Sequence, residues 1–198
     1  MPTKKYYAYI LPDGKTEITD SWAECEKAVK NQKGARYKSF KELDEAKKWL
    51  SSGATYDYQK EMPRGVYFDA GTGRGEGVEI SVTDETKKDL LSSAISKELI
   101  NAHGKHLLPP GKTNNYGELL ACFYALTIAI REDINLVLGD SGLVINYWSK
   151  GFIKTTVEEE TRKLAMEVSK LRKQFESKGG EVRQISGDDN PADLGFHK

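Results

Sequence analysis

The sequence predicts an α/β protein in which a mixed β-sheet is flanked by helices and preceded by a small ββαβα unit. Two patterns predict this fold class. Strand-length apolar runs alternate with helical patterns over residues 64–198, and short strand and helix patterns fit one compact unit over residues 1–50. Residues 51–63, which are rich in Ser, Gly and Tyr and end at Pro63, are predicted to link the two domains.

The first domain is predicted to contain three strands and two helices. In order, these are a strand over 6–10, a strand near 15–19, a helix after Ser21, a strand over 35–40 and a helix over about 42–50. Ser21 and Glu24 have the spacing of a capping box, in which each residue satisfies a backbone N–H of the other. This spacing predicts that the first helix begins directly after Ser21.

The second domain is predicted to alternate strands and helices. In order, these are strands at 66–68 and 78–82, a helix from Glu118 to Ile130, a strand at 134–139, helices over 143–148 and about 157–177, a strand at 181–185 and a final helix. In the helix from Glu118, Cys122, Ala125 and Ala129 form a small-residue side that can approach a sheet closely. Residues 84–111 are longer than a simple strand connection and are predicted to form an inserted lobe.

Four acidic residues stand at positions where a charge is costly. Asp69 and Asp140 each follow an apolar run, Glu118 opens a largely apolar helix, and Asp193 follows Asn-Pro-Ala. Carboxylates at the ends of buried strands need their charge compensated, and several that converge indicate bound cations. Oxygen ligands alone suit Mg²⁺ or Mn²⁺. Two such ions about 3.5–4 Å apart are a common device for phosphodiester hydrolysis.

The segments around these acids carry ordered motifs. They are Tyr67-Phe68-Asp69-Ala70-Gly71, Thr113-Asn114-Asn115-Tyr116-Gly117-Glu118, Gly139-Asp140-Ser141 and Ala192-Asp193. Together they resemble the D…E…D…D motifs of the type 1 ribonuclease H family, over about residues 65–198, and the segment from Thr113 to Glu118 is the most specific. The resemblance implies a ribonuclease H-like fold for this domain.

The resemblance also implies an activity, which is endonucleolytic hydrolysis of the RNA strand of RNA/DNA hybrids with 3′-hydroxyl and 5′-phosphate products. It implies that Asp69, Glu118, Asp140 and Asp193 hold two Mg²⁺ ions, with Mn²⁺ as a substitute. The residues it implies for contact with the nucleic acid in this domain are Thr72, Thr113, Asn114, Asn115, Thr155 and Thr156. The 2′-hydroxyl is the chemical ground for choosing RNA over DNA.

The loop before the last aspartate departs from the family pattern. Members often carry a histidine there, whereas this chain has Asp188 and Asp189. We expect Asp189 to assist the catalytic set by tuning metal exchange and product release, because a carboxylate can bind a metal ion transiently. The alternative is that both acids only hydrate the loop.

The first domain has a resemblance of its own. Tyr7, Trp22 and the segment 34–40, which includes Lys38, resemble the N-terminal hybrid-binding domain of ribonuclease H1, also found in caulimovirus viroplasmin. This implies that Tyr7 and Trp22 stack on the nucleic acid and that Lys38 neutralises phosphate. The alternative is that these side chains only pack. The basic protrusion of some bacterial members is not evident after Trp148, so its task is expected to pass to this domain.

Charge and composition narrow the function classes. The net charge is zero, but residues 1–50 hold 11 Lys and Arg against 8 acids, whereas residues 65–198 hold 17 against 20. No apolar run reaches the length of a membrane span, so we expect a cytoplasmic protein with no membrane partner and no obligate protein partner. Cys25 and Cys122 are expected to be buried thiols.

Two other function classes stay open. An exonuclease or transposase of the same superfamily would share the sheet, but a proofreading exonuclease would carry Asp-x-Glu where this chain has Asp69-Ala70-Gly71. The second alternative is a non-catalytic protein that binds RNA/DNA hybrids or double-stranded RNA. Cleavage of double-stranded RNA is not decided by the sequence.

Overall fold

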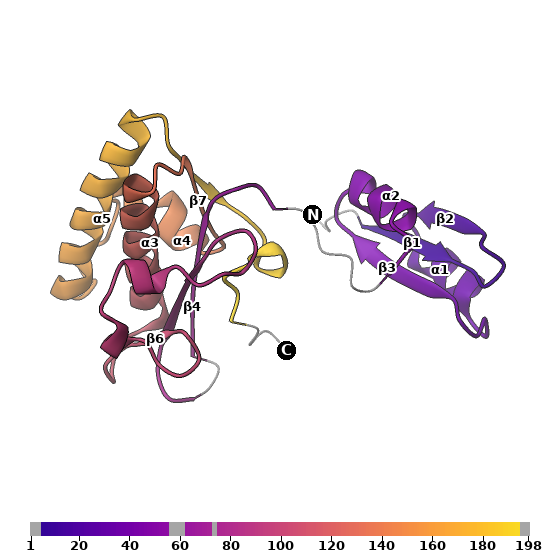
Figure 1. Ribbon diagram of the computed structural model, residues 1–198, viewed down its shortest axis with the longest axis horizontal. Coiled ribbons are helices and arrows are strands. Elements are labelled where there is room, and N and C mark those ends of the chain that lie inside the picture. Colours follow the sequence, from indigo (N-terminus) through magenta and orange to yellow (C-terminus); the bar gives the residue numbers. More distant parts are fainter. Residues whose placement is uncertain (1–4, 56–61, 73–74, 195–198) are drawn as a thin grey trace. The chain divides into compact units, whose positions relative to one another are not determined.

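The computed structural model describes residues 5–55, 62–72 and 75–194. The chain divides into two compact units, Met1–Lys60 and Glu61–Lys198. The smaller unit contains a three-stranded sheet, and the larger one contains a five-stranded sheet. Both units also contain helices (Figure 1). The predicted α/β fold class, with a mixed sheet flanked by helices and a small ββαβα unit before it, is confirmed.

The N-terminal unit is an antiparallel sheet with two helices. Its elements are β1 (Tyr6–Ile10), β2 (Thr16–Thr19), α1 (Trp22–Val29), β3 (Arg36–Phe40) and α2 (Leu43–Ser51), with sheet order β2-β1-β3. Ala8, Phe40, Ala46 and Trp49 form the buried core between the sheet and α2. The order of elements agrees with the prediction, and Cys25 is buried as expected.

Half of the predicted capping box forms. The Ser21 hydroxyl accepts a hydrogen bond from the Glu24 N–H at 3.4 Å. The Glu24 carboxylate, however, accepts from the Thr19 hydroxyl, and the Ser21 N–H donates to the Thr19 Oγ1 at 3.1 Å. The reciprocal bond predicted from spacing is therefore replaced, because the hydroxyl of Thr19 at the end of β2 lies between the two groups.

The first part of the predicted linker packs on the N-terminal unit. Helix α2 continues to Ser51, Ala54 is fully buried in the core of this unit, and the Trp49 indole N–H donates to the Thr55 carbonyl at 2.7 Å. Residues 56–61 of the predicted linker lie outside the described residues. Residues 51–55 thus belong to the N-terminal unit by their contacts.

The second unit is built on a mixed five-stranded sheet of order β6-β5-β4-β7-β8. The strands are β4 (Val66–Gly71), β5 (Glu79–Thr83), β6 (His106–Leu107), β7 (Leu136–Gly139) and β8 (Glu181–Gln184). β4, β5 and β6 pair antiparallel, whereas β4, β7 and β8 run parallel. Strand β4 is therefore the element at which the sheet changes from antiparallel to parallel pairing.

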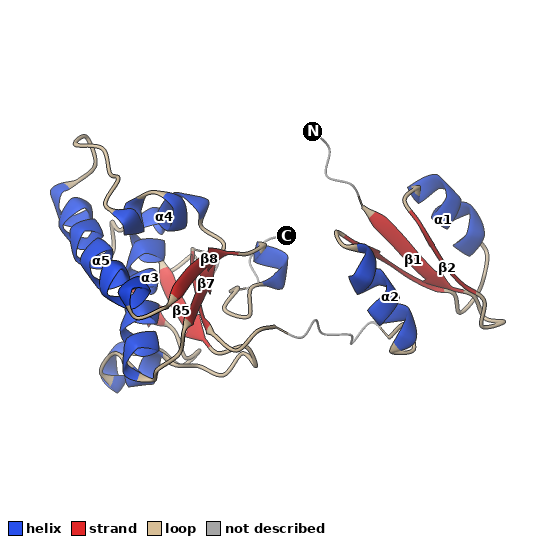
Figure 2. Cartoon of the chain, turned by 90° about the horizontal axis from the view of Figure 1, so that it is seen from above, coloured by secondary structure: helices blue, strands red, loops and turns tan. Residues whose placement is uncertain are grey.

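Three helices lie against one face of this sheet (Figure 2). They are α3 (Asn114–Arg131), α4 (Gly142–Asn146) and α5 (Glu159–Ser177). Val66 and Phe68 of β4 and Ile80 of β5 enter the main core together with residues of α3 and α5. None of the helices in the described part of the chain combines the length and the apolar character that crossing a membrane requires.

The opposite face is covered by loops. Tyr67 and Leu138 pack there against Ala192 of the segment after β8. On β5, Glu79 and Ser81 point away from the helices because side chains alternate along a strand. The segment between β5 and β6 covers them through two hydrogen bonds, Asn101 Nδ2 to Glu79 Oε1 and Lys105 Nζ to Ser81 Oγ, both 2.7 Å long.

One sequence prediction for this unit is wrong in part. The 84–111 segment is not only a lobe, because it contains two short 3₁₀ helices and then β6, which completes the edge of the sheet. The predicted final helix, after the loop that carries Asp193, lies almost entirely outside the described residues, which end at Leu194, and before it the chain forms a 3₁₀ turn over Gly187–Asp189. Pro191, which lacks a backbone N–H, and Asn190 favour such a turn over a helix.

Candidate active site

Asp69 lies inside strand β4, two residues before its end, and not at the end of a strand as predicted. β4 pairs with β5 through Gly71, but it pairs with β7 only at Val66 and Tyr67. Asp69 thus stands just beyond the last paired position with β7. In α/β sheets ligands bind where adjacent strands part, so the place of Asp69 fits a functional site.

Glu118 comes from the second turn of α3. The helix begins at Asn114, four residues earlier than predicted, because the Thr113 hydroxyl caps it by accepting from the Tyr116 N–H at 3.2 Å. At Gly117 a Cβ atom would stand 2.4 Å from Val78 Cγ1 and 3.0 Å from Ala70 Cβ. The missing side chain lets this turn lie directly on the sheet, which brings Glu118 next to β4.

Asp140 follows the last residue of β7. Gly139 lies against the Phe68 ring, where a Cβ atom would be 2.5 Å from the nearest ring carbon. The Asp140 carbonyl accepts a hydrogen bond from Gln184 Nε2 at 3.1 Å. The backbone around Asp140 is therefore held by the neighbouring strands on both sides.

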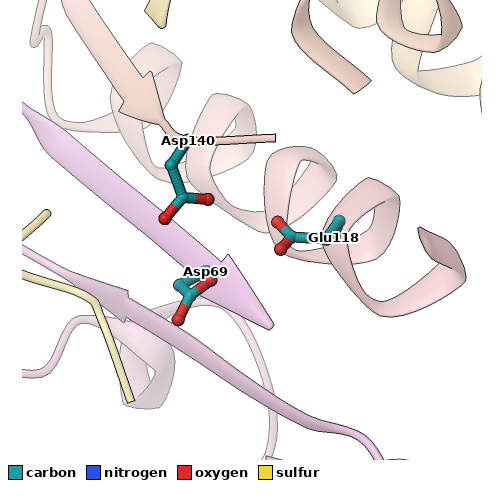
Figure 3. A group of neighbouring side chains, drawn as sticks. All are labelled: Asp69, Glu118 and Asp140. Carbon is teal, nitrogen blue, oxygen red and sulfur yellow. The ribbon is translucent and has the colours of Figure 1, made fainter. Parts of the chain in front are cut away.

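The carboxyl groups of Asp69, Glu118 and Asp140 converge. One oxygen from each lies within 4.8 Å of the other two, and Figure 3 shows the three groups pointing into one space. Asp69 and Glu118 are only 3% and 5% exposed. The side of α3 that carries Cys122, Ala125 and Ala129 is buried, in agreement with the close approach expected for this helix.

The site disfavours three negative charges. Burial, followed by the charge of Asp140, raises the pKa of Asp69 to about 6. Burial, followed by the charges of Asp69 and Asp140, raises the pKa of Glu118 to about 9. Glu118 Oε2 is buried and has no hydrogen-bond partner among the described residues. A bound cation would offset both the repulsion between the buried carboxylates and the cost of burying an oxygen that has no hydrogen bond.

Asp193 lies near this triad but outside it. Its negative charge contributes to the raised pKa of Asp69, while the three-carboxylate group itself does not include it. The neighbouring Leu194 N–H donates to Asp69 Oδ2 at 3.1 Å. The segment after β8 therefore reaches the exposed side of the site.

Asn190 is a site-forming residue that the sequence reasoning missed. It is buried, and its amide donates to the Phe68 carbonyl at 3.0 Å and accepts from the Ala192 N–H at 3.1 Å. These bonds attach the loop that carries Asp193 to β4 next to Asp69. The Asn-Pro pair signalled a turn, but only the tertiary contact shows what the side chain binds.

Asp189 belongs to a turn that lies against Asp140. A Cβ atom on Gly187 would be 3.1 Å from Asp140 Oδ2. Asp189 is partly buried, whereas Asp188 is exposed. The turn thus borders the site, and Asp189 is the less exposed of its two acids.

The other candidate residues of this unit are accessible. Thr113, Asn114 and Asn115 are exposed at the start of α3, Thr72 is exposed after β4, and Thr155 and Thr156 are exposed before α5. The first three come from the same turn of backbone that leads to Glu118. A substrate strand that contacts them would therefore pass close to the triad.

In the N-terminal unit two of the three candidate residues meet. Tyr7 and Trp22 have ring centroids 5.5 Å apart, and Trp22 and Tyr37 are 5.7 Å apart. Trp22 and Tyr37 are each 42% exposed. Tyr37 is thus a third member of an open aromatic cluster, and it was not among the predicted site residues, although its alternation with buried Phe40 could have indicated it.

Lys38 lies on the opposite face of the sheet from this cluster. It pairs with Ala8 of β1, whereas Tyr37 pairs with Tyr9, and paired residues share a face. Its ammonium stands 5.9 Å from the centre of the Phe40 ring. The structure therefore does not bring Lys38 together with Tyr7 and Trp22.

A comparison with protein-family models agrees with the resemblance of the N-terminal domain. Residues 5–50 match the family model of the ribonuclease H1 N-terminal domain. No match is found among curated protein sequences.

Three solved structures are similar to the chain. The N-terminal RNase H domain of Rv2228c from Mycobacterium tuberculosis is 20% identical over 63% of this chain and 83% of that one, with a TM-score of 0.38. RNase H1 from Halobacterium salinarum is 19% identical over 65% of this chain and 89% of that one, with a TM-score of 0.37. LC11-RNase H1 isolated from compost is 19% identical over 65% of this chain and 88% of that one, with a TM-score of 0.41. The match over residues 5–50 shows that the N-terminal unit is similar to the ribonuclease H1 N-terminal domain.

Proposed function

We propose that this protein is a ribonuclease H that cleaves the RNA strand of RNA/DNA hybrids. The observation that carries the proposal is the convergence of Asp69, Glu118 and Asp140 from three separate elements, two of them almost fully buried, in a chain whose N-terminal unit is similar to the ribonuclease H1 N-terminal domain. Buried carboxylates that converge are costly to folding unless their charge is compensated. Their retention is explained by a bound metal.

The donor set fits a hard divalent cation. It offers only carboxylate oxygens, which Mg²⁺ and Mn²⁺ prefer, and Glu118 Oε2 has no hydrogen-bond partner within the described part of the chain. Asp69, Glu118 and Asp140, with Asp193 as an outer ligand, would hold two Mg²⁺ ions, with Mn²⁺ as a substitute. Bound there, the ions would supply a nucleophile at neutral pH and stabilise charge on the phosphate and the leaving oxygen.

The chain's own residues would bind and orient the substrate. Asn114 and Asn115 stand at the exposed turn before Glu118, where their amides can hydrogen-bond the 2′-hydroxyls of the RNA strand. Thr113, Thr155, Thr156 and Thr72 offer hydroxyls to the sugar-phosphate backbone. Addition of water to the phosphorus with departure of the 3′ oxygen would leave a 3′-hydroxyl on one fragment and a 5′-phosphate on the other.

The N-terminal unit would add affinity by a second contact. Tyr7 and Trp22, together with Tyr37, form an accessible aromatic surface on which a nucleic acid can stack. Lys38, on the other face, would contribute through charge and not through the same stack. Tethering two binding units raises the effective concentration of the substrate at the second.

One assay tests the proposal. The full chain is incubated with end-labelled RNA/DNA, RNA/RNA and DNA/DNA duplexes in Mg²⁺, in Mn²⁺ and in EDTA. We expect cuts only in the RNA strand of the hybrid and only with metal, and ligation of the fragments to adaptors identifies the end groups. Binding of the hybrid without any cut would support the alternative, a non-catalytic binder, and cuts in RNA/RNA would widen the substrate range.

A further inference from the structure

A cluster of three side chains, Lys112, Tyr116 and Glu160, joins the start of α3 to the first turn of α5. The ammonium of Lys112 is paired with Glu160 Oε2, and the Tyr116 hydroxyl donates to Glu160 Oε1 at 3.1 Å. The Lys112 ammonium also lies 4.6 Å from the centre of the Tyr116 ring. The three side chains thus form a closed set in which each contacts the other two.

The sequence pattern does not distinguish Glu160 from its acidic neighbours. In the run Glu158–Glu160, all three acids fit a solvated helix start. In the structure Glu159 pairs with Lys163 of its own helix, as an exposed i,i+4 pair does. Glu160 differs because both of its partners come from a segment more than 40 residues earlier in the chain.

The two partners of Glu160 lie on either side of residues that are proposed to bind the substrate. Lys112 and Tyr116 flank Thr113, Asn114 and Asn115, the exposed residues proposed to contact the hybrid. Lys112 is partly covered, with 22% of its side chain exposed, whereas the three residues between are open to solvent. Both ends of this short segment are therefore fastened, while its middle is free to meet a ligand.

We propose that Glu160 is a positioning residue for substrate binding, which holds the segment 112–116 in the conformation that presents Asn114 and Asn115 to the hybrid. This inference rests on the proposed function and names a determinant of its substrate contact. A fixed segment loses less conformational entropy on binding than a mobile one, so pre-organisation of this kind strengthens binding.

The chemical step should be less affected than binding. Glu118 is held from the other side, since Gly117 lies directly against Ala70 of β4 and against Val78, the residue before β5. Loss of the Glu160 contacts leaves that packing in place. We therefore expect the effect of a Glu160 variant to fall on KM and the dissociation constant of the hybrid and not on kcat.

Glu160→Gln is the main test, with Glu159→Gln as the matched control that removes the same charge one residue away. We expect Glu160→Gln to raise KM roughly threefold to tenfold, in the range of a lost charge-assisted hydrogen bond, with kcat changed less than about twofold. Tyr116→Phe, which keeps the ring and removes one bond to Glu160, should give part of this rise. Glu159→Gln should match the wild type.

A double-mutant cycle with Lys112→Met and Glu160→Gln tests the coupling between the two side chains. If both act through one cluster, the double variant should bind no more weakly than the weaker single variant. The opposite sign would overturn the inference: tighter hybrid binding by Glu160→Gln would mean that Glu160 competes with phosphate for Lys112. An unchanged KM for Glu160→Gln would overturn the inference as well. So would a variant in which kcat falls threefold to tenfold while KM stays the same.

The same variants can be compared without cleavage. Hybrid affinity measured by fluorescence anisotropy in the Asp140→Asn background does not depend on the chemical step. A wild-type protein that fails to cut the hybrid contradicts the proposed function, whereas a Glu160→Gln protein that binds as its parent does contradicts the positioning role. The two failures are therefore told apart.

Discussion

The carboxyl groups of Asp69 and Glu118 lie together in the buried triad, with one oxygen of each within 4.8 Å of the other. Two negative charges at this distance repel each other, and because both groups are almost fully buried, this repulsion favours a proton on one of them. The pKa of Glu118 is raised to about 9 and that of Asp69 to about 6, so Glu118 holds the proton at neutral pH. The metal-free site is therefore partly protonated, and metal binding has to displace this proton.

Glu118→Gln should stabilise the metal-free protein at neutral and alkaline pH. The native pKa lies above the ordinary value of 4.5, so between pH 4.5 and about 9 the native state binds more protons than the unfolded state, and stability falls as pH rises. Glutamine cannot ionise and avoids this cost. In EDTA we expect the melting temperature of Glu118→Gln to exceed that of the wild type by about 2–4 °C for each kcal/mol gained.

The pH profile serves as the control for this prediction. The advantage of Glu118→Gln should be larger at pH 8 than at pH 5, because the cost grows through that window. Excess Mg²⁺ should reverse the order, since the wild type gains binding energy that the variant loses. If Glu118→Gln is less stable than the wild type at both pH values in EDTA, the Glu118 carboxyl group does not destabilise the metal-free protein.

Mg²⁺ binding should release protons. Ligands must be deprotonated to bind a metal, and Glu118 is protonated at neutral pH. Isothermal titration calorimetry at pH 7.5 in two buffers of different ionisation enthalpy measures the number of protons released. We expect about one proton per site for the wild type and close to none for Glu118→Gln, and equal values for the two proteins would place the proton elsewhere.

Asp140→Asn should remove cleavage while the fold and hybrid affinity stay. Asp140 is the least buried member of the triad and is flanked by backbone contacts that do not involve its carboxylate, such as the Gln184 bond to its carbonyl. Loss of a carboxylate at a preorganised site lowers rates by roughly 10²–10³. Single-turnover cleavage and a binding assay on the same preparation check this, and a rate above about a tenth of the wild type would contradict the metal role.

The triad could be inferred from the sequence because its members come from segments with clear local patterns. Asp69 and Asp140 follow apolar runs, and Glu118 shares a helix side with small residues. The limits of the elements were harder to infer. Thr113 caps α3, which begins at Asn114, four residues before the predicted start at Glu118, since the first turn of a helix can be polar.

The sequence contains no comparable pattern that predicts contacts between distant segments. Glu160 looks like its neighbours in sequence, and only the packing of α5 against α3 brings it to Tyr116. Lys38 and Trp22 could not be assigned to faces without the register of β1 and β3. A change of one residue in register moves every side chain to the other face, so this distinction requires the structure.

Deletion of residues 1–60 should weaken hybrid binding and leave the rate at saturating substrate unchanged. Trp22→Ala should reproduce most of the loss, because Trp22 stands between Tyr7 and Tyr37 in the open aromatic cluster. Base or sugar stacking on one aromatic side chain contributes about 1–3 kcal/mol, so a tenfold weaker affinity is expected. Leu43→Ala, at an exposed apolar residue of α2, is the control, and unchanged affinity of a folded Trp22→Ala protein would exclude the stacking role.

Asp189→Asn should slow turnover without slowing the chemical step. The turn over Gly187–Asp189 lies against the Asp140 carboxylate, and Asp189 is partly buried there whereas Asp188 is exposed. An acid at the border of a metal site can bind an ion transiently as product leaves, and product release limits many enzymes. We expect a lower steady-state kcat with an intact single-turnover rate, and Asp188→Asn as the neighbouring control should change neither. Equal losses in both modes would assign Asp189 to the chemical step, and no loss in either would leave it as a hydrated loop charge.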